Sequence, residues 1–311
     1  MTSPVPLERT GAVLVTLGGG APGPAAPLAL RLASVPLVVV GVTRGDVDDR
    51  WFELCDVVIA ADDPALGAIE ENLERFPLAA AALALLLRGQ PGRPVDEGLV
   101  AESAVYSVLQ SGPEFATWRS HHPVRHEPDD GVRVRLKREG PRLILTMTRP
   151  DRLNALDARM RDELVEGLRV AAADPGITVV ELRGEGRAFC AGGDLDEFGS
   201  RSDPASAHVL RLQRSVGREL SHLGARTTAY VHGACVGSGI ELAAFADRVV
   251  AAPDTLIALP EIGLGLVPGA GGTVSLTRRI GRLRTAWLAF SGRTIDAATA
   301  HSWGLVDDLE P

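Results

Sequence analysis

The sequence predicts an α/β fold built from two unequal regions. Short valine-rich apolar runs, bounded by polar turn residues, indicate buried strands next to helical segments in the first region. A segment rich in Pro, Asp and His, SHHPVRHEPDDG at 120–131, then indicates a linker. Beyond it, strands and helices follow each other in mixed order rather than in strict βαβ alternation. We therefore expect an N-terminal α/β extension and linker at 1–128 and a second domain at 129–311.

Composition and charge exclude several classes of protein. Hydrophobic residues make up 45% and charged residues 23% of the 311 residues, as in ordinary globular domains. The net charge of -8 argues against a nucleic-acid partner, because phosphates would be repelled. The most apolar stretch, Leu78–Leu87, is about half the length of a membrane span, so we expect a buried helix and no membrane partner.

The cysteines and the N-terminus favour a cytoplasmic protein. Cys55, Cys190 and Cys235 are scattered without metal-ligand spacing, which is typical of reduced thiols in the cytoplasm. The N-terminal residues lack the basic start and apolar core of a signal peptide. No metal site is expected, and we assign His121, His122 and His126 to the solvated linker.

The first region is predicted to form a small parallel sheet covered by helices. Strands are expected at 12–17, 37–42 and 56–60, and helices at 64–76, 78–88 and 99–119, the last broken at 111–113. Asp63 is a candidate cap of the 64–76 helix, with Pro64 in its first turn. Gly18–Gly20 is assigned to a loop rather than a phosphate site, because no GxGxxG or GKS/GKT pattern accompanies it.

The second region begins with a predicted hairpin and continues with alternating strands and helices. The hairpin strands are expected at 132–137 and 143–148, the later strands at 178–183, 229–232 and 248–251, and the helices at 157–173 and 207–223. A further helix should begin near Ser238.

Four segments of this region carry the functional signal. They are RPDRLNALD (149–157), RAFCAGGDLDEF (187–198), VHGACVGSGIELAAFAD (231–247) and LPEIGLGLVPGAGGT (259–273). In this order and at these separations the sequence resembles the enoyl-CoA hydratase/isomerase (crotonase) superfamily from Val132 to Leu309. The resemblance implies a ββα spiral core.

Two departures from the family concern the ends of the chain. The family-type C-terminal helical region, which normally follows the segment at 304–306, is not present before Pro311, and an N-terminal extension is added. We expect helices 78–88 and 99–119 to supply part of the missing cover of the acyl pocket.

The glycine-rich segments suit a site that stabilises a thioester enolate. Negative charge on a carbonyl oxygen needs fixed hydrogen-bond donors, and each such donor contributes about 3 kcal/mol. The AGGD turn leaves an amide unobstructed, and GSGIEL begins a helix whose first amides lack partners. The resemblance assigns the two oxyanion donors to the backbone N–H groups of Gly193 and Ser238. Ser238 stands where the family usually has glycine.

Two carboxylates complete the predicted chemistry. Glu241 lies in the first turn of the helix that begins near Ser238, and Glu261 follows Pro260. The resemblance implies that Glu241 activates water and that Glu261 protonates the α-carbon. Two glutamates that share a water can do this, because like-charge repulsion keeps one of them protonated. Retention of both favours hydration of a 2-enoyl-CoA to a 3-hydroxyacyl-CoA over isomerisation.

Coenzyme A enters as part of the substrate, and no permanently bound cofactor is expected. The resemblance assigns its binding to Leu153, Ala155, Ala191, Gly193, Asp194, Leu195, Asp196 and Ser238. Hydratases often have lysine at the position of Asp196, and Arg149, Arg152 and Arg187 are candidates to compensate for its loss. Loop 199–206 is expected to border the acyl pocket, and Cys190 and Cys235 are assigned to packing.

Several outcomes stay open at the level of sequence. The same enolate chemistry fits an enoyl-CoA isomerase. Long N-terminal extensions also occur in a cofactor-free branch of the superfamily that oxygenates an arylacetyl-CoA. The missing C-terminal helices also fit a non-catalytic acyl-CoA-binding subunit. Analogy with the family suggests a homo-oligomer, a trimer or a hexamer.

Overall fold

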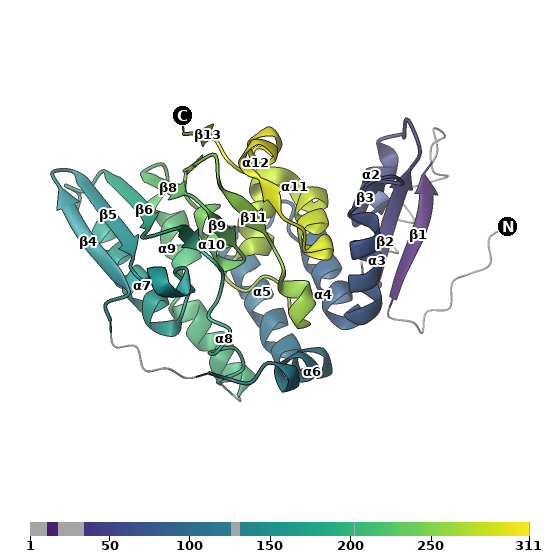
Figure 1. Ribbon diagram of the computed structural model, residues 1–311, viewed down its shortest axis with the longest axis horizontal. Helices are drawn as coiled ribbons and strands as arrows, with labels where there is room; N and C mark the ends of the chain where they lie inside the picture. The colour runs from purple at the N-terminus through teal and green to yellow at the C-terminus, as the bar shows by residue number, and fades with distance from the viewer. Residues whose placement is uncertain (1–10, 18–33, 126–130, 202, 311) are drawn as a thin grey trace.

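The computed structural model describes residues 11–17, 34–125, 131–201 and 203–310. These residues form three sheets with helices between and around them (Figure 1), which confirms a mixed α/β fold. The predictions for Gly18–Gly20 and His126 lie outside the described residues.

The N-terminal sheet is parallel, as predicted, with strand order β1-β2-β3. The elements of this region are β1 (Gly11–Leu17), β2 (Leu37–Thr43), α2 (Arg50–Leu54), β3 (Val57–Ala60), α3 (Leu66–Arg75), α4 (Pro77–Arg88), α5 (Val95–Gln110) and α6 (Pro113–His121). Helix α3 begins two residues later than predicted. Asp63 still accepts a hydrogen bond from the Ala65 amide, and Pro64 precedes the helix.

Two further sheets form the core of the second region. The six-stranded sheet has the order β13-β10-β8-β6-β5-β4 and the four-stranded sheet the order β12-β11-β9-β7. Their strands are β4 (Val134–Glu139), β5 (Arg142–Met147), β6 (Val179–Gly184), β7 (Ala188–Cys190), β8 (Thr227–Val231), β9 (Ala234–Val236), β10 (Arg248–Ala251), β11 (Leu256–Ala258), β12 (Ile295–Asp296) and β13 (Asp308–Leu309).

Consecutive strands of this core alternate between the two sheets. Strands β6, β8 and β10 join the larger sheet, and the strand after each of them, β7, β9 or β11, joins the smaller one. Neighbouring strands from β5 to β13 in the larger sheet are parallel, and β4–β5 forms the predicted antiparallel hairpin. This alternation is the ββα spiral that the resemblance implied.

The helices of the second region follow the strands. They are η1 (Pro150–Arg152), α7 (Ala158–Ala173), α8 (Pro204–Gln213), α9 (Val216–Leu223), α10 (Ser238–Ala243), η2 (Glu261–Leu264), α11 (Gly272–Ser291) and α12 (Ala297–Trp303). The prediction of one helix over 207–223 was wrong. Ser215 separates α8 from α9, because its side chain accepts a hydrogen bond from the Arg218 amide and caps a new helix.

The N-terminal region packs against helix α11. In Figure 1, α3 and α4 lie between the β1–β3 sheet and α11. Asn72 of α3 donates to the Phe290 carbonyl (2.9 Å), and Arg282 of α11 donates to the Phe52 carbonyl (2.6 Å). Helix α4 is largely buried, as its apolar sequence predicted, and no described helix has the length and apolar character needed to cross a membrane.

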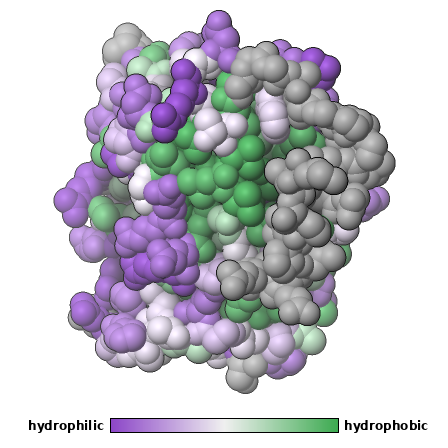
Figure 2. Space-filling view, turned by 90° about the vertical axis from the view of Figure 1, so that its right-hand side faces the viewer, coloured by the Kyte–Doolittle hydropathy of each residue, from purple (hydrophilic) through white to green (hydrophobic). Residues whose placement is uncertain are grey.

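The opposite face of the β1–β3 sheet carries its own small apolar cluster. Leu17, Val39 and Cys55 are buried there, and Val15 and Trp51 pack against them. Figure 2 looks at the molecule from this side and shows apolar residues gathered at the centre of the face.

Candidate active site

A cavity brings the four predicted catalytic residues together. Gly193 follows β7, Ser238 and Glu241 lie on α10, and Glu261 begins η2. All four line one cavity whose walls also include α5, α8 and the loop 269–271. Three separate glycine-rich segments of the sequence therefore converge on a single site.

Two backbone amides face this site without a partner. The Leu156 amide donates to the Gly192 carbonyl (2.8 Å), and the Asp194 amide donates to the Leu156 carbonyl (2.9 Å). In such a parallel bridge the amide of the intervening Gly193 points the other way. The Ser238 amide occupies the first position of α10. Neither amide finds an acceptor within the described part of the chain, so both can donate to a bound carbonyl oxygen.

Close packing explains why glycine is needed beside these amides. A Cβ atom on Gly193 would lie 2.5 Å from the Phe198 ring. Gly237 has a φ of 51°, and a Cβ atom there would lie 2.5 Å from Oε1 of Glu261. Both glycines therefore leave room for neighbours that a side chain would displace. Ser238 is buried, and its Oγ lies 3.9 Å from Sγ of Cys190.

Glu241 is a buried carboxylate held by the loop that leads into α11. Its Oε2 accepts hydrogen bonds from the Ala270 and Gly272 amides, each at 2.8 Å. Burial raises the pKa of Glu241 to about 7, although the loop amides oppose the shift by stabilising the charged form. At neutral pH both its protonated and its ionised forms are thus populated.

Glu261 is a buried carboxyl group whose Oε2 has no hydrogen-bond partner among the described residues. Burial raises its pKa well above the ordinary value, and repulsion from Glu241 and Glu102 adds to the shift. Both glutamates therefore keep a proton to higher pH than an exposed glutamate does.

Glu102 is a third buried glutamate of the cavity, and the sequence did not single it out. It lies on α5, its Oε1 accepts from the Gly271 amide (2.7 Å), and its Oε2 accepts from the Thr273 amide and hydroxyl (2.8 and 2.7 Å). The sequence did carry a signal for this residue. Glu102 interrupts an apolar stripe of the helix, with Leu99 three residues before it and Tyr106 four residues after it.

The N-terminal extension thus forms part of the cavity wall. Helix α5 contributes Leu99, Glu102 and Tyr106, while no residue of α4 lines the cavity. Of the two helices expected to cover the acyl pocket, 99–119 contributes residues of α5 to this cavity, whereas 78–88 packs against α11 instead. Gly199, Ser200 and Arg201 of the predicted 199–206 loop also line the cavity, but helix α8 already begins at Pro204.

The two segments predicted to receive coenzyme A run side by side. Ala191 donates to the Leu153 carbonyl (3.0 Å), and the Leu156–Gly192 and Asp194–Leu156 bonds continue the pairing. Asp194 lines the cavity together with Gly193 and Ser238. Leu153, Ala155, Ala191, Leu195 and Asp196 lie next to these residues but are not among the residues that line the cavity.

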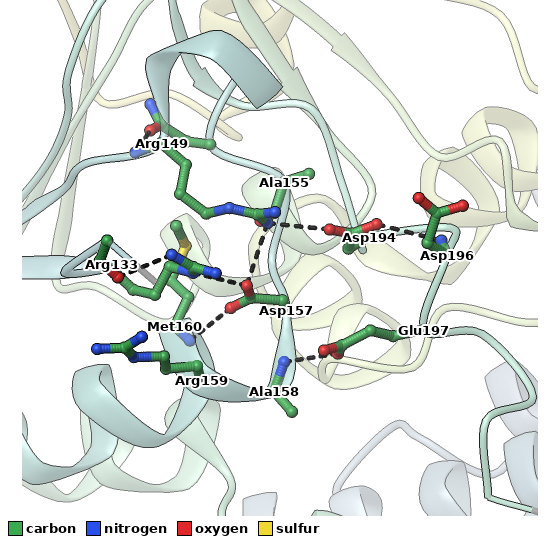
Figure 3. Close-up of polar contacts among 12 residues, drawn as sticks. Arg133, Arg149, Ala155, Asp157, Ala158, Arg159, Met160, Asp194, Asp196 and Glu197 are labelled. Atoms are coloured by element: carbon green, nitrogen blue, oxygen red, sulfur yellow. Dashed lines mark hydrogen bonds and ion pairs between the residues drawn. The ribbon is translucent and has the colours of Figure 1, made fainter. Parts of the chain in front are cut away.

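Beneath these segments lies a buried ion-pair cluster, shown in Figure 3. Arg149 donates to Asp194 (3.0 Å) and lies 3.3 Å from Asp157, which also accepts from Arg133 (2.7 Å). Arg149 was a candidate to contact a coenzyme A phosphate, but its side chain is only 7% exposed and is engaged by Asp194 and Asp157. It joins the two binding segments instead.

The remaining candidates have structural surroundings. Cys190 and Cys235 are fully buried, and burial raises the pKa of both thiols, so they are protonated at neutral pH. His121 ends helix α6, and His122 caps it and stacks on Trp118.

Comparison with known proteins gives a consistent result. The sequence profile of the enoyl-CoA hydratase/isomerase family matches residues 142–311. A 2,3-dehydroadipyl-CoA hydratase of Escherichia coli is 38% identical over 169 residues, or 54% of this chain and 66% of the relative. A 1,2-epoxyphenylacetyl-CoA isomerase of the same organism is 36% identical over 53% of this chain and 64% of the relative.

Solved structures agree with this assignment. The crystal structure of an enoyl-CoA hydratase from Thermoplasma volcanium is 32% identical, covers 58% of this chain and 72% of that one, and superposes with a TM-score of 0.54. The chain spans just under two thirds of the first three curated relatives, 66, 64 and 63% of their lengths. With the family profile matching more than half of its residues, the chain belongs to the enoyl-CoA hydratase/isomerase family.

Proposed function

We propose that this protein hydrates a 2-enoyl-CoA to the 3-hydroxyacyl-CoA. One observation carries the proposal: two buried glutamates whose pKa values are both raised, Glu241 and Glu261, line the same cavity as two unpartnered amides. Hydration needs a base for water, an acid for the α-carbon and donors for the thioester oxygen, and this set supplies all of them.

The proposed reaction begins with the thioester carbonyl between the amides of Gly193 and Ser238. Their N–H groups stabilise the charge that develops on the oxygen when the β-carbon is attacked. Coenzyme A would extend along the paired segments 153–156 and 191–196. The substrate carries the coenzyme, and the proposal requires no permanently bound cofactor.

The two carboxyl groups then move protons in opposite directions. Glu241, whose carboxylate form accepts hydrogen bonds from two loop amides, takes a proton from water as the water oxygen bonds to the β-carbon. Glu261, whose protonated form burial favours, gives its proton to the α-carbon as the enolate collapses. One water is added across the double bond, and a proton passes from Glu241 back to Glu261 through solvent to restore the starting state.

An enoyl-CoA isomerase is the second candidate, and a 37%-identical relative of Bacillus subtilis that is named a putative enoyl-CoA hydratase/isomerase favours it. An isomerase needs one group to remove and return a proton, and Glu261 alone could do this. Retention of Glu241, held by two amides at 2.8 Å, favours hydration because a water base has no task in isomerisation.

The decisive experiment incubates the full chain with crotonyl-CoA, a 3-enoyl-CoA and an arylacetyl-CoA. We expect loss of enoyl absorbance, a product heavier by one water, and no oxygen uptake. Conversion of the 3-enoyl-CoA without gain of water would replace the proposal with isomerisation, and oxygen uptake would replace it with oxygenation. Binding of all three thioesters without turnover would favour a non-catalytic acyl-CoA-binding subunit.

Matched variants test the roles of the carboxyl groups. Glu241→Gln and Glu261→Gln should each lower kcat by roughly 10²–10⁴-fold, with the dissociation constant of a coenzyme A thioester changed only a few-fold. Glu181→Gln is the control, because Glu181 is buried but lies on β6 and pairs with Arg142 and Arg183. Near-normal turnover in the Glu261 variant would remove that residue from the mechanism.

A further inference from the structure

Glu102 reaches the active site from outside the family-matched segment. The family profile begins at residue 142, whereas Glu102 lies on α5 in the N-terminal extension. It is 2% exposed, and both of its oxygens accept hydrogen bonds from the loop that leads into α11. The extension thus contributes an ionisable side chain to the cavity as well as an apolar wall.

Glu102 and Glu241 accept hydrogen bonds from alternate backbone amides of the same loop. Glu241 accepts hydrogen bonds from the amides of residues 270 and 272, and Glu102 accepts them from the amides of residues 271 and 273. Since successive amides point to different sides, the loop is held between two carboxylates that approach from different helices. Any shift of the loop toward one carboxylate lengthens the hydrogen bonds to the other. The position of the Glu241 carboxylate therefore depends on Glu102.

The surroundings of Glu102 make its own position rigid. Gln90 donates to the Thr273 hydroxyl (3.2 Å), which in turn donates to Glu102, so the hydroxyl is oriented toward the carboxylate. A Cβ atom on Gly269 would lie 2.4 Å from the Tyr106 ring, which shows how closely α5 packs on the loop. Every contact of the Glu102 oxygens is with a donor, a pattern that stabilises the ionised form.

We propose that Glu102 is a positioning residue of the active site, which fixes the 269–273 loop and thereby orients the Glu241 carboxylate toward the attacking water. The inference rests on the proposed function for the role of Glu241, but the coupling between the two carboxylates does not. A positioning role of this kind affects turnover more than binding, because misplacement of a reacting group by about 1 Å can lower the rate by roughly 100-fold.

The charge of Glu102 also acts on its neighbours. Glu241 of α10, Glu261 of η2, Tyr106 of α5 and Arg211 of α8 are the ionisable groups that interact with it. Burial raises the pKa of Glu102 to about 8, with repulsion from Glu241 adding to the shift. Because repulsion between two carboxylates is mutual, removal of the charge at Glu102 should make Glu261 ionise at lower pH.

The test compares Glu102→Gln with the control Glu181→Gln in the full chain labelled with ¹³C at the glutamate carboxyl carbons. The Glu241 and Glu261 resonances are assigned by their loss in the corresponding Gln variants, and their titrations are followed by NMR without any turnover. We expect Glu102→Gln to move the Glu261 titration to lower pH. It should also lower kcat on the thioester about 10–100-fold with KM within a few-fold, while the control changes neither.

A second pair of variants guards against failure to fold. Thr273→Val removes a donor to Glu102 and leaves both carboxylates in place, whereas Thr273→Ser keeps the hydroxyl. We expect the first to lower kcat and the second to retain it. A merely structural role would lower thermal stability and leave the titrations unmoved. The proposal is overturned by a folded Glu102→Gln with wild-type titrations, or, if that variant does not fold, by equal kcat for the two Thr273 variants. If the wild type turns over no thioester, the proposed function fails, and the titrations of Glu102→Gln still decide the coupling.

Discussion

Replacement of Glu241 by Gln should change how the stability of the protein depends on pH. Burial raises the pKa of this carboxyl group from 4.5 to about 7. Below pH 4.5 Glu241 is protonated in both the folded and unfolded states, and above pH 7 it is ionised in both. Between these values the folded state binds more protons, so its stability falls as pH rises.

The size of the effect follows from the shift. The difference of 2.5 pH units (7 − 4.5) corresponds to about 3 kcal/mol at 1.36 kcal/mol per unit. Gln cannot ionise, so the free energy of unfolding of the variant does not fall in this way as pH rises. The free energy of unfolding of Glu241→Gln minus that of the wild type should therefore increase by about 3 kcal/mol between pH 4.5 and 7. Gln also places an NH₂ group near the loop amides, which adds a penalty that does not depend on pH.

Urea unfolding at half-unit pH intervals measures this difference. Subtraction of the wild-type curve removes the titration of groups that the substitution does not affect. Release of repulsion on Glu102 and Glu261 acts in the same direction, since their raised pKa values partly depend on Glu241. A difference that stays constant between pH 4.5 and 7 would refute the burial of an ionisable Glu241.

Two further substitutions test the architecture of the site. Gly237→Ala should destabilise the fold by about 1–2 kcal/mol through its positive φ, as measured by thermal unfolding. The added Cβ should also displace Glu261 and lower kcat. An unchanged kcat would contradict the close approach of Gly237 to the Glu261 carboxyl group. Arg149→Met should destabilise by roughly 3–5 kcal/mol in urea, because it removes the cation that pairs with the Asp194 carboxylate, while Asp157 keeps Arg133. Arg138→Met, at a half-exposed pair, should change stability by at most about 1 kcal/mol, and equal losses for the two arginines would count against the buried cluster.

Local features of the fold were accessible from the sequence because their causes are local. The valine-rich runs of the N-terminal sheet and the β4–β5 hairpin follow from apolar periodicity and turn residues. The break at Ser215 was missed, since the apolar pattern continues through α8 and α9 while a single capping side chain ends one helix and starts the next.

The buried cluster around Arg149 shows a different limit. In the sequence this arginine lies in a polar turn, RPDRLN, which favours an exposed side chain. Only the pairing of segments 153–156 and 191–194 brings Asp194 beside it, and that pairing joins residues about 40 positions apart. No local pattern carries this information.

The sequence by itself determined the family and predicted the residues of the candidate site: glycines where amides must be unobstructed, and two glutamates at fixed distances along the chain from them. The spacing suffices because each motif is a turn or a helix start whose geometry is set by its own residues. The tertiary structure alone decided which proton affinities these glutamates have and what holds them. Burial raises their pKa values, and Glu102, which is 139 positions before Glu241, enters the site only because α5 packs against the loop before α11.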